Sequence, residues 1–400
     1  MKATARFRRV ALVHDRLDQH GGAERVLAVL HDMFPSAPIF TAMWNREAVP
    51  RFEGCDVRVS WMQRLPGIAS LPRAYAALYP IAFAQLDLHG YDLVISHTTS
   101  FAKGVRVDPG ALHVCYCASP SNFLWRPQAY FPSKRSRLAT LPLRAWLKAW
   151  DRRAASQPQV YVANGAAVAD RIRKFYGRPS AVIPPAVDSF WFTEHRADEF
   201  YLVAGRLVAQ KRVDLAIRAC GRLGVPLVVV GTGRDAGQLR RLAGPDVTFL
   251  GRVPDAELRE LYARARSVIL PAEEDFGLVP VEAQAASTPV IAYDAGGARE
   301  TVIEGVTGIR FSPQTVDALA AAIDRAARVS WNRSRIQANA SRFSEERFRS
   351  AVLSLLENLP ERVGVPERDR ATPSAAPRLA ADAPFGALSG ASPSKGDADR

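Results

Sequence analysis

A short apolar run, Val268–Leu270, leads into a loop with three consecutive acids, the second of which is Glu274. A helix is predicted to begin near Pro280, because proline is favoured in a first helical turn. Glu282 lies on that helix, with seven residues between it and Glu274. Backbone N–H groups of residues 276–279 at the helix start can bind an anion. The same spacing also fits a solvated acidic loop followed by an ordinary helix cap.

Two cations stand at the start of another predicted helix. Gly205, Arg206 and Lys211 come directly after the predicted strand Tyr201–Ala204. A glycine lets backbone approach a ligand closely, and two cations five residues apart can neutralise a diphosphate. The alternative is a basic helix N-terminus without a ligand. That arrangement opposes the helix dipole, so a bound anion accounts for it better.

A glycine-rich turn follows the predicted strand Leu227–Val230. Gly231 and Gly233 have a spacing that is compatible with a dinucleotide-binding turn. The next predicted strand is followed by Gly251 and Arg252, however, and not by the acid that would bind a ribose hydroxyl. We therefore expect a tight turn beside a nucleotide rather than an NAD site.

A glycine pair, Gly21 and Gly22, precedes a predicted helix near the N-terminus. The pair follows a predicted strand that ends near His14, and Ala23, Glu24 and Arg25 come after it. Paired glycines before a helix let phosphate oxygens reach backbone N–H groups. A plain tight turn explains the pair equally well when it is taken alone.

The composition indicates a basic protein with ordinary globular character. The chain has 400 residues, 48% of them apolar, and a formal net charge of +13, which favours anionic partners. Four cysteines, two of them at Cys115 and Cys117, form neither a disulfide framework nor a zinc site, so we expect a reducing cytoplasm. No run of about 18 apolar residues predicts a spanning helix. We expect a cytoplasmic chain that is peripheral to a membrane.

Short apolar runs alternate with helical patterns along most of the chain, which is typical of parallel sheets covered on both faces. The series restarts after Asp188, so we predict an α/β protein with two doubly wound domains and a ligand cleft between them. The predicted units are an N-terminal domain (1–188), a second domain (189–332), a C-terminal helix (333–360) and a disordered tail (361–400). The predicted strands are Arg9–Val13, Pro38–Ala42, Val57–Trp61, Leu93–Ser96, His113–Cys117, Val160–Ala163, Ala181–Ile183, Tyr201–Ala204, Leu227–Val230, Val247–Leu250, Val268–Leu270 and Val290–Ala292.

In combination, these motifs resemble the family 4 retaining nucleotide-sugar glycosyltransferases. The resemblance covers about residues 8–358 and implies the GT-B fold, in which two Rossmann-like domains face each other and a C-terminal helix returns to the first domain. The N-terminal motif resembles a bacterial subgroup that transfers mannose and similar sugars onto lipid-linked polysaccharide precursors, such as those of lipopolysaccharide and exopolysaccharide. The resemblance thus implies a GDP-mannose donor, a lipid-linked acceptor and the inner face of the cytoplasmic membrane.

The resemblance also implies roles for individual residues. Arg206 and Lys211 would bind the donor diphosphate and support its departure, and Glu274 would contact the donor sugar, so that these three carry the catalysis. Preorganised cations and helix N-termini would stabilise the leaving group without a metal or another cofactor. The remaining donor-binding residues would be Gly21, Gly22, Gly205, Gly231, Gly233, Arg252, Phe276, Gly277, Leu278 and Glu282, the last of them on the ribose.

One region departs from the family pattern. Relatives often carry a histidine and an arginine where this chain has Ala118 and Asn122, just before Trp125. Asn122, Trp125 and His97 are therefore the candidate acceptor-side residues, although a structural role for His97 is the stronger expectation. The departure leaves a catalytically degenerate nucleotide-sugar-binding partner as the main alternative to an enzyme.

A basic stretch with several tryptophans, residues 125–153, bears on the acceptor. Basic groups beside tryptophans suit an anionic membrane interface, and a solvated helix is the comparable alternative. A specific nucleic-acid-binding function is disfavoured because the chain lacks a recognition motif and its sharpest features are acidic. An NAD-dependent oxidoreductase is disfavoured for want of the ribose-binding acid.

Overall fold

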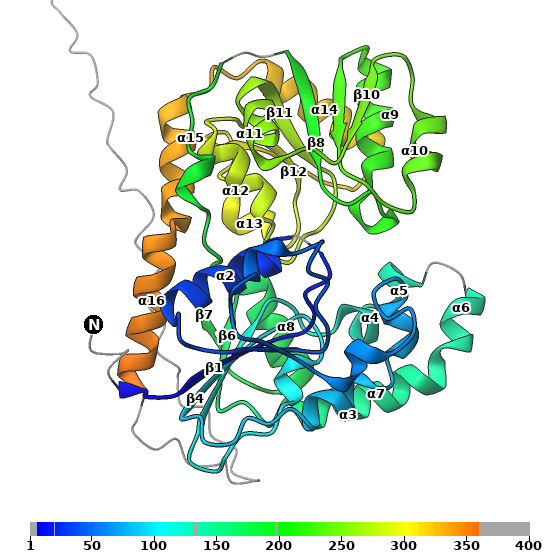
Figure 1. The fold of residues 1–400 in the computed structure, drawn as a ribbon. Coiled ribbons are helices and arrows are strands. Elements are labelled where there is room, and N and C mark those ends of the chain that lie inside the picture. Colours follow the sequence, from blue (N-terminus) through cyan, green and yellow to red (C-terminus); the bar gives the residue numbers. More distant parts are fainter. Residues whose placement is uncertain (1–5, 20, 132–133, 197–198, 360–400) are drawn as a thin grey trace, which may run out of the picture.

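The computed structural model describes residues 6–19, 21–131, 134–196 and 199–359. The tail predicted over 361–400 lies outside the described residues. The chain forms two α/β lobes, one above the other in Figure 1, with the C-terminal helices running along one side of both.

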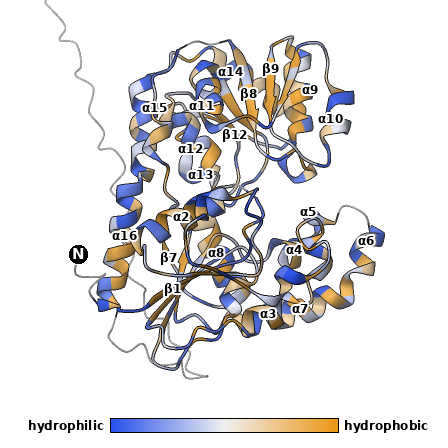
Figure 2. Ribbon diagram, in the orientation of Figure 1, coloured by the Kyte–Doolittle hydropathy of each residue, from blue (hydrophilic) through white to orange (hydrophobic). Residues whose placement is uncertain are grey.

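The N-terminal lobe is built on a parallel sheet of order β3-β2-β1-β4-β5-β6-β7. Short runs of apolar and β-branched residues form the central strands, which are buried on both faces because helices cover each side (Figure 2). Its strands are β1 (Val10–His14), β2 (Ile39–Thr41), β3 (Val57–Val59), β4 (Leu93–Thr98), β5 (Leu112–Cys117), β6 (Val160–Ala163) and β7 (Ala181–Val182). Its helices are α2 (Gly22–Met33), α3 (Tyr79–Ala84), α4 (Asn122–Trp125), α5 (Pro127–Tyr130), α6 (Lys134–Ala139), α7 (Leu141–Ala154) and α8 (Ala166–Tyr176), with short 3-10 turns between several of them.

The second lobe repeats the design with a parallel sheet of order β10-β9-β8-β11-β12-β13. Its strands are β8 (Phe200–Ala204), β9 (Leu227–Val230), β10 (Val247–Gly251), β11 (Ala265–Leu270), β12 (Val290–Tyr293) and β13 (Gly308–Phe311). Its helices are α9 (Val213–Leu223), α10 (Ala236–Leu242), α11 (Asp255–Arg264), α12 (Leu278–Ala285), α13 (Ala298–Thr301) and α14 (Val316–Ala327). Two apolar clusters, one on each face of the sheet, form its core.

The C-terminal helical stretch is broken rather than continuous. α15 (Arg333–Ala340) packs on α12 of the second lobe, whereas α16 (Glu345–Asn358) crosses to the first lobe and packs on α2. A 3-10 turn, η7 (Ser341–Phe343), separates the two, and the Ser344 side chain caps α16 by accepting from the backbone N–H of Arg347. The break is needed because Phe343 belongs to the core of the second lobe while Phe348 belongs to that of the first.

Candidate functional site between the lobes

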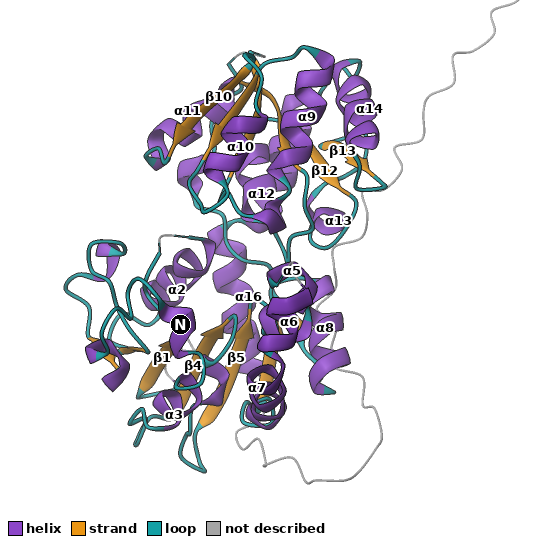
Figure 3. Ribbon diagram, turned by 90° about the vertical axis from the view of Figure 1, so that its right-hand side faces the viewer, coloured by secondary structure: helices purple, strands orange, loops and turns teal. Residues whose placement is uncertain are grey.

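The carboxyl ends of both sheets face each other across the lobe boundary, so the loops that follow the strands meet there (Figure 3). The acid loop, residues 271–277, runs from β11 to α12. Gly277 precedes α12 with φ of +84°, in a conformation that favours glycine, and no side chain caps the helix. The first N–H groups of this helix are therefore available to an anion.

Glu274 and Lys211 form an ion pair beside this helix start. Lys211 ends the turn η6 (Ala209–Lys211), and both side chains are partly exposed. The backbone carbonyl of Glu274 accepts from the Gly297 N–H at 3.0 Å, which fixes the loop against the segment after β12. Glu274, expected to contact the donor sugar, and Lys211, expected to bind the diphosphate, thus lie side by side.

Glu282 is buried on α12, with only 4% of its surface exposed. One of its oxygens accepts from the Tyr262 hydroxyl at 3.1 Å, and the other pairs with the Arg25 guanidinium of the first lobe. Burial raises the pKa of the Glu282 carboxyl, and the Arg25 charge and the Tyr262 hydrogen bond oppose that rise. Arg25 also contacts Asp255 at 3.2 Å and lies 4.9 Å from the ring of Trp191.

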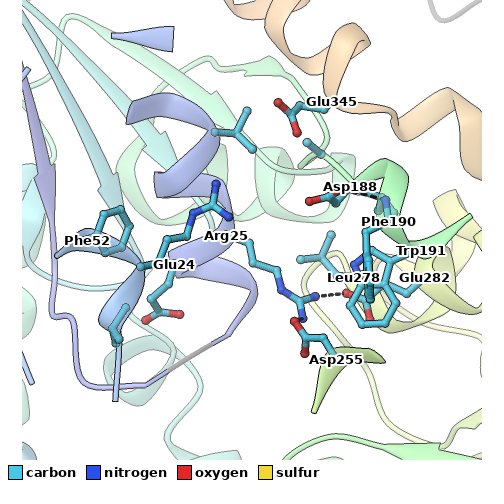
Figure 4. Close-up of a pocket in the computed structure, with 15 residues that line it drawn as sticks. Glu24, Arg25, Phe52, Asp188, Phe190, Trp191, Asp255, Leu278, Glu282 and Glu345 are labelled. Carbon is cyan, nitrogen blue, oxygen red and sulfur yellow. Dashed lines mark hydrogen bonds and ion pairs between the residues drawn. The ribbon is translucent and has the colours of Figure 1, made fainter. Parts of the chain in front are cut away.

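Arg25, Asp255, Trp191 and Glu282 line a pocket of about 290 Å³ between the lobes (Figure 4). Leu278 and Glu282 come from α12, Arg25 from α2, and Trp191 from the turn that links the two lobes. The pocket therefore draws on both lobes and on their linker.

Three glycines stack the loops after β8 and β9 against each other. A Cβ on Gly231 would lie 1.8 Å from the carbonyl oxygen of Gly205, and one on Gly233 would lie 2.2 Å from that of Leu207. Gly205 and Gly231 also have φ of +145° and +128°. Only glycine fits this crossing, so these positions shape the loops that flank Lys211.

The glycine pair of the first lobe meets the start of α12. Gly21 is the uncapped N-cap of α2, and a Cβ on Gly22 would lie 2.7 Å from the Leu278 side chain. Two helix N-termini without side-chain caps, those of α2 and α12, therefore converge on one spot. Their dipoles both favour negative charge there.

The other predicted donor-side residues are spread around this centre. Arg206 and Arg252 are exposed, and no carboxylate among the described residues pairs with either. Phe276 is buried and packs edge-on against Phe343, so its side chain holds the acid loop in the core.

The three acceptor-side candidates are placed differently from one another. Asn122 reaches the boundary and donates to Asp275 at 3.0 Å. Trp125 donates to the buried Asp151 at 2.7 Å, which makes it an anchor of α4. His97 is only 1% exposed and stacks on His14, so the structure places it in the core of the first lobe and not on the cleft wall.

Sequence reasoning missed several residues that join the lobes. Arg25 reaches Glu282, and Arg171 on α8 pairs with Asp275 at 2.5 Å. Glu300 accepts from the N–H groups of Ala166 and Ala167 at 2.9 and 3.3 Å, and so caps α8 from the other lobe. Only Arg25 had a local signal of its role in the sequence, because a cation in a first helical turn opposes the helix dipole.

In the part of the chain that the structure describes, no three His, Cys, Asp or Glu side chains form a potential metal site.

Two family models match the chain, one in each lobe. Residues 20–189 match Glycosyltransferase Family 4, and residues 189–343 match Glycosyl transferases group 1. The two matches meet at the start of the linker turn η5 (Ser189–Trp191).

Curated relatives match over a segment only. An uncharacterized glycosyltransferase of Methanocaldococcus jannaschii is 35% identical over 138 residues, 32% of this chain and 35% of that protein. A glycogen synthase of Mycobacterium tuberculosis is 38% identical over 134 residues, 30% of this chain and 32% of that protein. A D-inositol 3-phosphate glycosyltransferase of Mycobacterium marinum is 38% identical over 136 residues, 30% of this chain and 28% of that protein. The chain thus spans about a third of the length of these relatives.

Solved structures match over most of the chain. HepE of Anabaena in complex with UDP-glucose superposes with a TM-score of 0.68 at 21% identity, over 88% of this chain and 100% of that one. Sucrose-phosphate synthase of Thermosynechococcus elongatus gives a TM-score of 0.68 at 19% identity, over 88% and 98%. Together with the two parallel sheets, these likenesses show the GT-B fold and confirm the predicted fold class.

Proposed function

We propose that this chain is a retaining glycosyltransferase that moves a sugar from a nucleotide-sugar donor to a lipid-linked polysaccharide acceptor. The proposal is supported by the match of residues 20–189 to the family 4 model and of residues 189–343 to the group 1 model. The observation that carries the proposal is the meeting of two uncapped helix N-termini at Gly22 and Leu278, beside Lys211. A diphosphate is the anion that suits this position, since N–H groups and a cation can surround it.

The proposed chemistry follows from this arrangement. The donor diphosphate lies at the start of α12, where Lys211 and the exposed Arg206 stabilise the negative charge that grows on the leaving group. Lys211 is then shared between Glu274 and the phosphate, which frees Glu274 oxygens for the sugar hydroxyls. Glu282 takes the ribose. No step in this scheme requires a metal ion.

Mannose from GDP-mannose is the proposed sugar, as the resemblance of the N-terminal motif suggests. A UDP-sugar is the second candidate donor, because HepE, with the same fold, was solved with UDP and with UDP-glucose. GDP-mannose and UDP-glucose differ in both the base and the sugar but share the diphosphate, so the proposed diphosphate contacts suit either donor.

A basic and apolar face of the first lobe supports a lipid-linked acceptor and a peripheral membrane location. α7 buries only a narrow stripe, whereas the side chains of Leu138, Leu141, Leu143 and Trp146 are 39–71% exposed. The exposed cations beside them are Lys134, Arg135, Arg152 and Arg153. We call these eight residues the α6–α7 face. Its apolar and cationic groups suit an anionic bilayer, and no described helix is long and apolar enough to cross one.

The test is a transfer assay with labelled GDP-mannose or UDP-glucose, a bacterial membrane fraction as the acceptor source, and EDTA present. We expect label to enter the lipid phase with the wild type and not with Lys211→Ala. A protein that binds the nucleotide sugar but transfers nothing would instead indicate the degenerate binding partner. Nuclear magnetic resonance of the product would test retention of the anomeric configuration.

A further inference from the structure

The three consecutive acids of the acid loop point alternately to two different lobes. Glu274 pairs with Lys211 of its own lobe. Its neighbours cross the boundary: Glu273 pairs with Arg126 at 2.5 Å, and Asp275 pairs with Arg171, also at 2.5 Å. Docking of the outer two acids on the first lobe therefore fixes the segment that carries the middle one.

Asp275 is held by two side chains of the first lobe at once. One carboxylate oxygen pairs with Arg171 Nη1 and the other accepts from Asn122 Nδ2 at 3.0 Å. Arg171 is 12% exposed and Asp275 is 28% exposed, so the pair is shielded from solvent far more than a surface ion pair. The Arg171 guanidinium also lies 3.5 Å from Asn122 Oδ1, and its Nη2 is buried without a hydrogen-bond partner among the described residues.

Both first-lobe partners stand on firmly anchored elements. Asn122 opens α4, and its neighbours Ser121 and Trp125 both donate to Asp151, which forms a fully buried ion pair with Lys103. Arg171 is fixed by its Nε–H, which donates to the Ala167 carbonyl at 3.1 Å. Asn122 and Arg171 therefore hold Asp275 from two elements that are themselves anchored in the first lobe.

We propose that Arg171, on α8, is a positioning residue for the acid loop. It docks Asp275 on the first lobe and so keeps Glu274 and the start of α12 aligned with the acceptor side. Asn122 contacts the Asp275 carboxylate but carries no charge, so the ion pair with this carboxylate comes from Arg171. The inference rests on the proposed function, because the alignment matters only if Glu274 handles the donor sugar.

The test compares Arg171→Gln with the matched control Arg173→Gln, an exposed arginine on the same helix. In the transfer assay, we expect Arg171→Gln to lower the maximal rate by on the order of 10- to 100-fold, as small misplacements of reacting groups do. The KM for the donor stays within about threefold, because Lys211 and Glu282 are untouched. Arg173→Gln behaves like the wild type. An unchanged maximal rate in Arg171→Gln overturns the proposal.

Moving the arginine distinguishes a positioning role from a structural one. The double variant Asn122→Arg with Arg171→Gln restores a guanidinium beside Asp275, and we expect it to recover the rate to within about threefold of the wild type. Failure of this rescue in a variant that unfolds at the wild-type temperature overturns the assignment.

A second measurement tests the docking role of Arg171 even if the proposed function is wrong. If the wild type transfers no sugar, docking is measured by small-angle X-ray scattering of the unliganded protein. Arg171→Gln and Asp275→Asn are each expected to increase the radius of gyration, whereas Arg173→Gln leaves it unchanged. An unchanged radius in the first two variants contradicts the docking role whatever the enzyme's activity.

Discussion

Asp15, which follows β1, holds the backbone of the loop after β4. Its carboxylate is buried and accepts from the backbone N–H groups of Thr99, Phe101 and Ala102 at 2.6–2.7 Å. These hydrogen bonds and the neighbouring His14 lower the pKa of Asp15, against the opposing effect of burial. Asp15 therefore fixes the loop after β4 to the end of β1, a few residues before the glycine pair that meets α12.

Two buried histidines predict a pH-dependent stability. Burial lowers the pKa of both His97 and His113 to about 3 from an ordinary value of 6.5, with the His14 charge adding to the effect at His97. The unfolded chain thus binds more protons than the folded one between these values, so stability falls as the pH drops through this window. Each histidine contributes a slope of up to about 1.4 kcal/mol per pH unit.

Urea unfolding at pH 5.0, 5.75 and 6.5 measures this slope. We expect His97→Phe and His113→Phe each to make it shallower. His89→Gln is expected to make it slightly steeper, because the hydrogen bond to Asp108 raises the pKa of His89 and so favours the folded state at low pH. A slope that is equal in all four proteins would contradict the assignment of neutral buried histidines.

At the residue scale, local motifs lead to the proposed donor-side residues but not to the contacts between the lobes. Glu274, Lys211 and Glu282 lie in short motifs whose residue types already indicate their chemistry. Arg25 and Glu282 are 257 positions apart, and Asn122 and Asp275 are 153 apart. Pairings of this kind depend on how two separate sheets are oriented, which no local pattern encodes.

At the element scale, every strand predicted from the alternation of apolar runs and helical patterns is present in the structure, with shifts of a few residues at the ends. β13 (Gly308–Phe311) was missed because it is short and begins with glycine, which weakens strand patterns. The C-terminal stretch was predicted as one helix, since nothing in its apolar spacing marks the change of lobe at Phe343. The capping role of Ser344 is the local signal that could have located the break.

The glycine crossing predicts a sharp steric effect. Gly231→Ala places a methyl group 1.8 Å from the Gly205 carbonyl oxygen, at a φ that alanine rarely adopts. We expect a loss of a few kcal/mol in unfolding free energy together with loss of nucleotide binding. Gly221→Ala, in α9 with no atom near the added methyl, is expected to leave binding intact and to stabilise the protein by up to about 1 kcal/mol. Chemical denaturation with a nucleotide-binding assay measures both, and equal behaviour of the two variants would contradict the packing argument.

At the scale of the whole molecule, the two sheets and their connection follow from the repeated strand–helix pattern. The relative placement of the lobes follows instead from particular side chains, namely Arg25, Arg126, Arg171 and Glu300. Three of these contacts are ion pairs across the boundary, and Glu300 accepts from backbone N–H groups at the start of α8. The net charge of +13 indicates an anionic partner but does not say where it binds, and the structure adds the exposed α6–α7 face as a candidate surface.

The α6–α7 face predicts binding to anionic membranes. We expect co-sedimentation with vesicles that contain phosphatidylglycerol, weakening as salt is raised, and little binding to phosphatidylcholine alone. The double variant Leu138→Ser with Trp146→Ser is expected to bind at least about tenfold more weakly, because two exposed apolar side chains are lost. Leu250→Ser, at an equally apolar exposed position of the second lobe, is the control. Wild-type binding by the double variant would rule this face out.

The most direct measurement of the central claim is calorimetric titration of the purified protein with GDP-mannose, UDP-glucose, dTDP-glucose and ADP-glucose. We predict binding of one nucleotide class, weakened at least about tenfold, or about 1.4 kcal/mol, in Glu282→Gln and in Lys211→Ala. Glu257→Gln and Lys174→Ala, at exposed positions on α11 and α8, should bind like the wild type. No binding of any of these nucleotide sugars, or binding that survives both site variants unchanged, would contradict a donor site between the lobes.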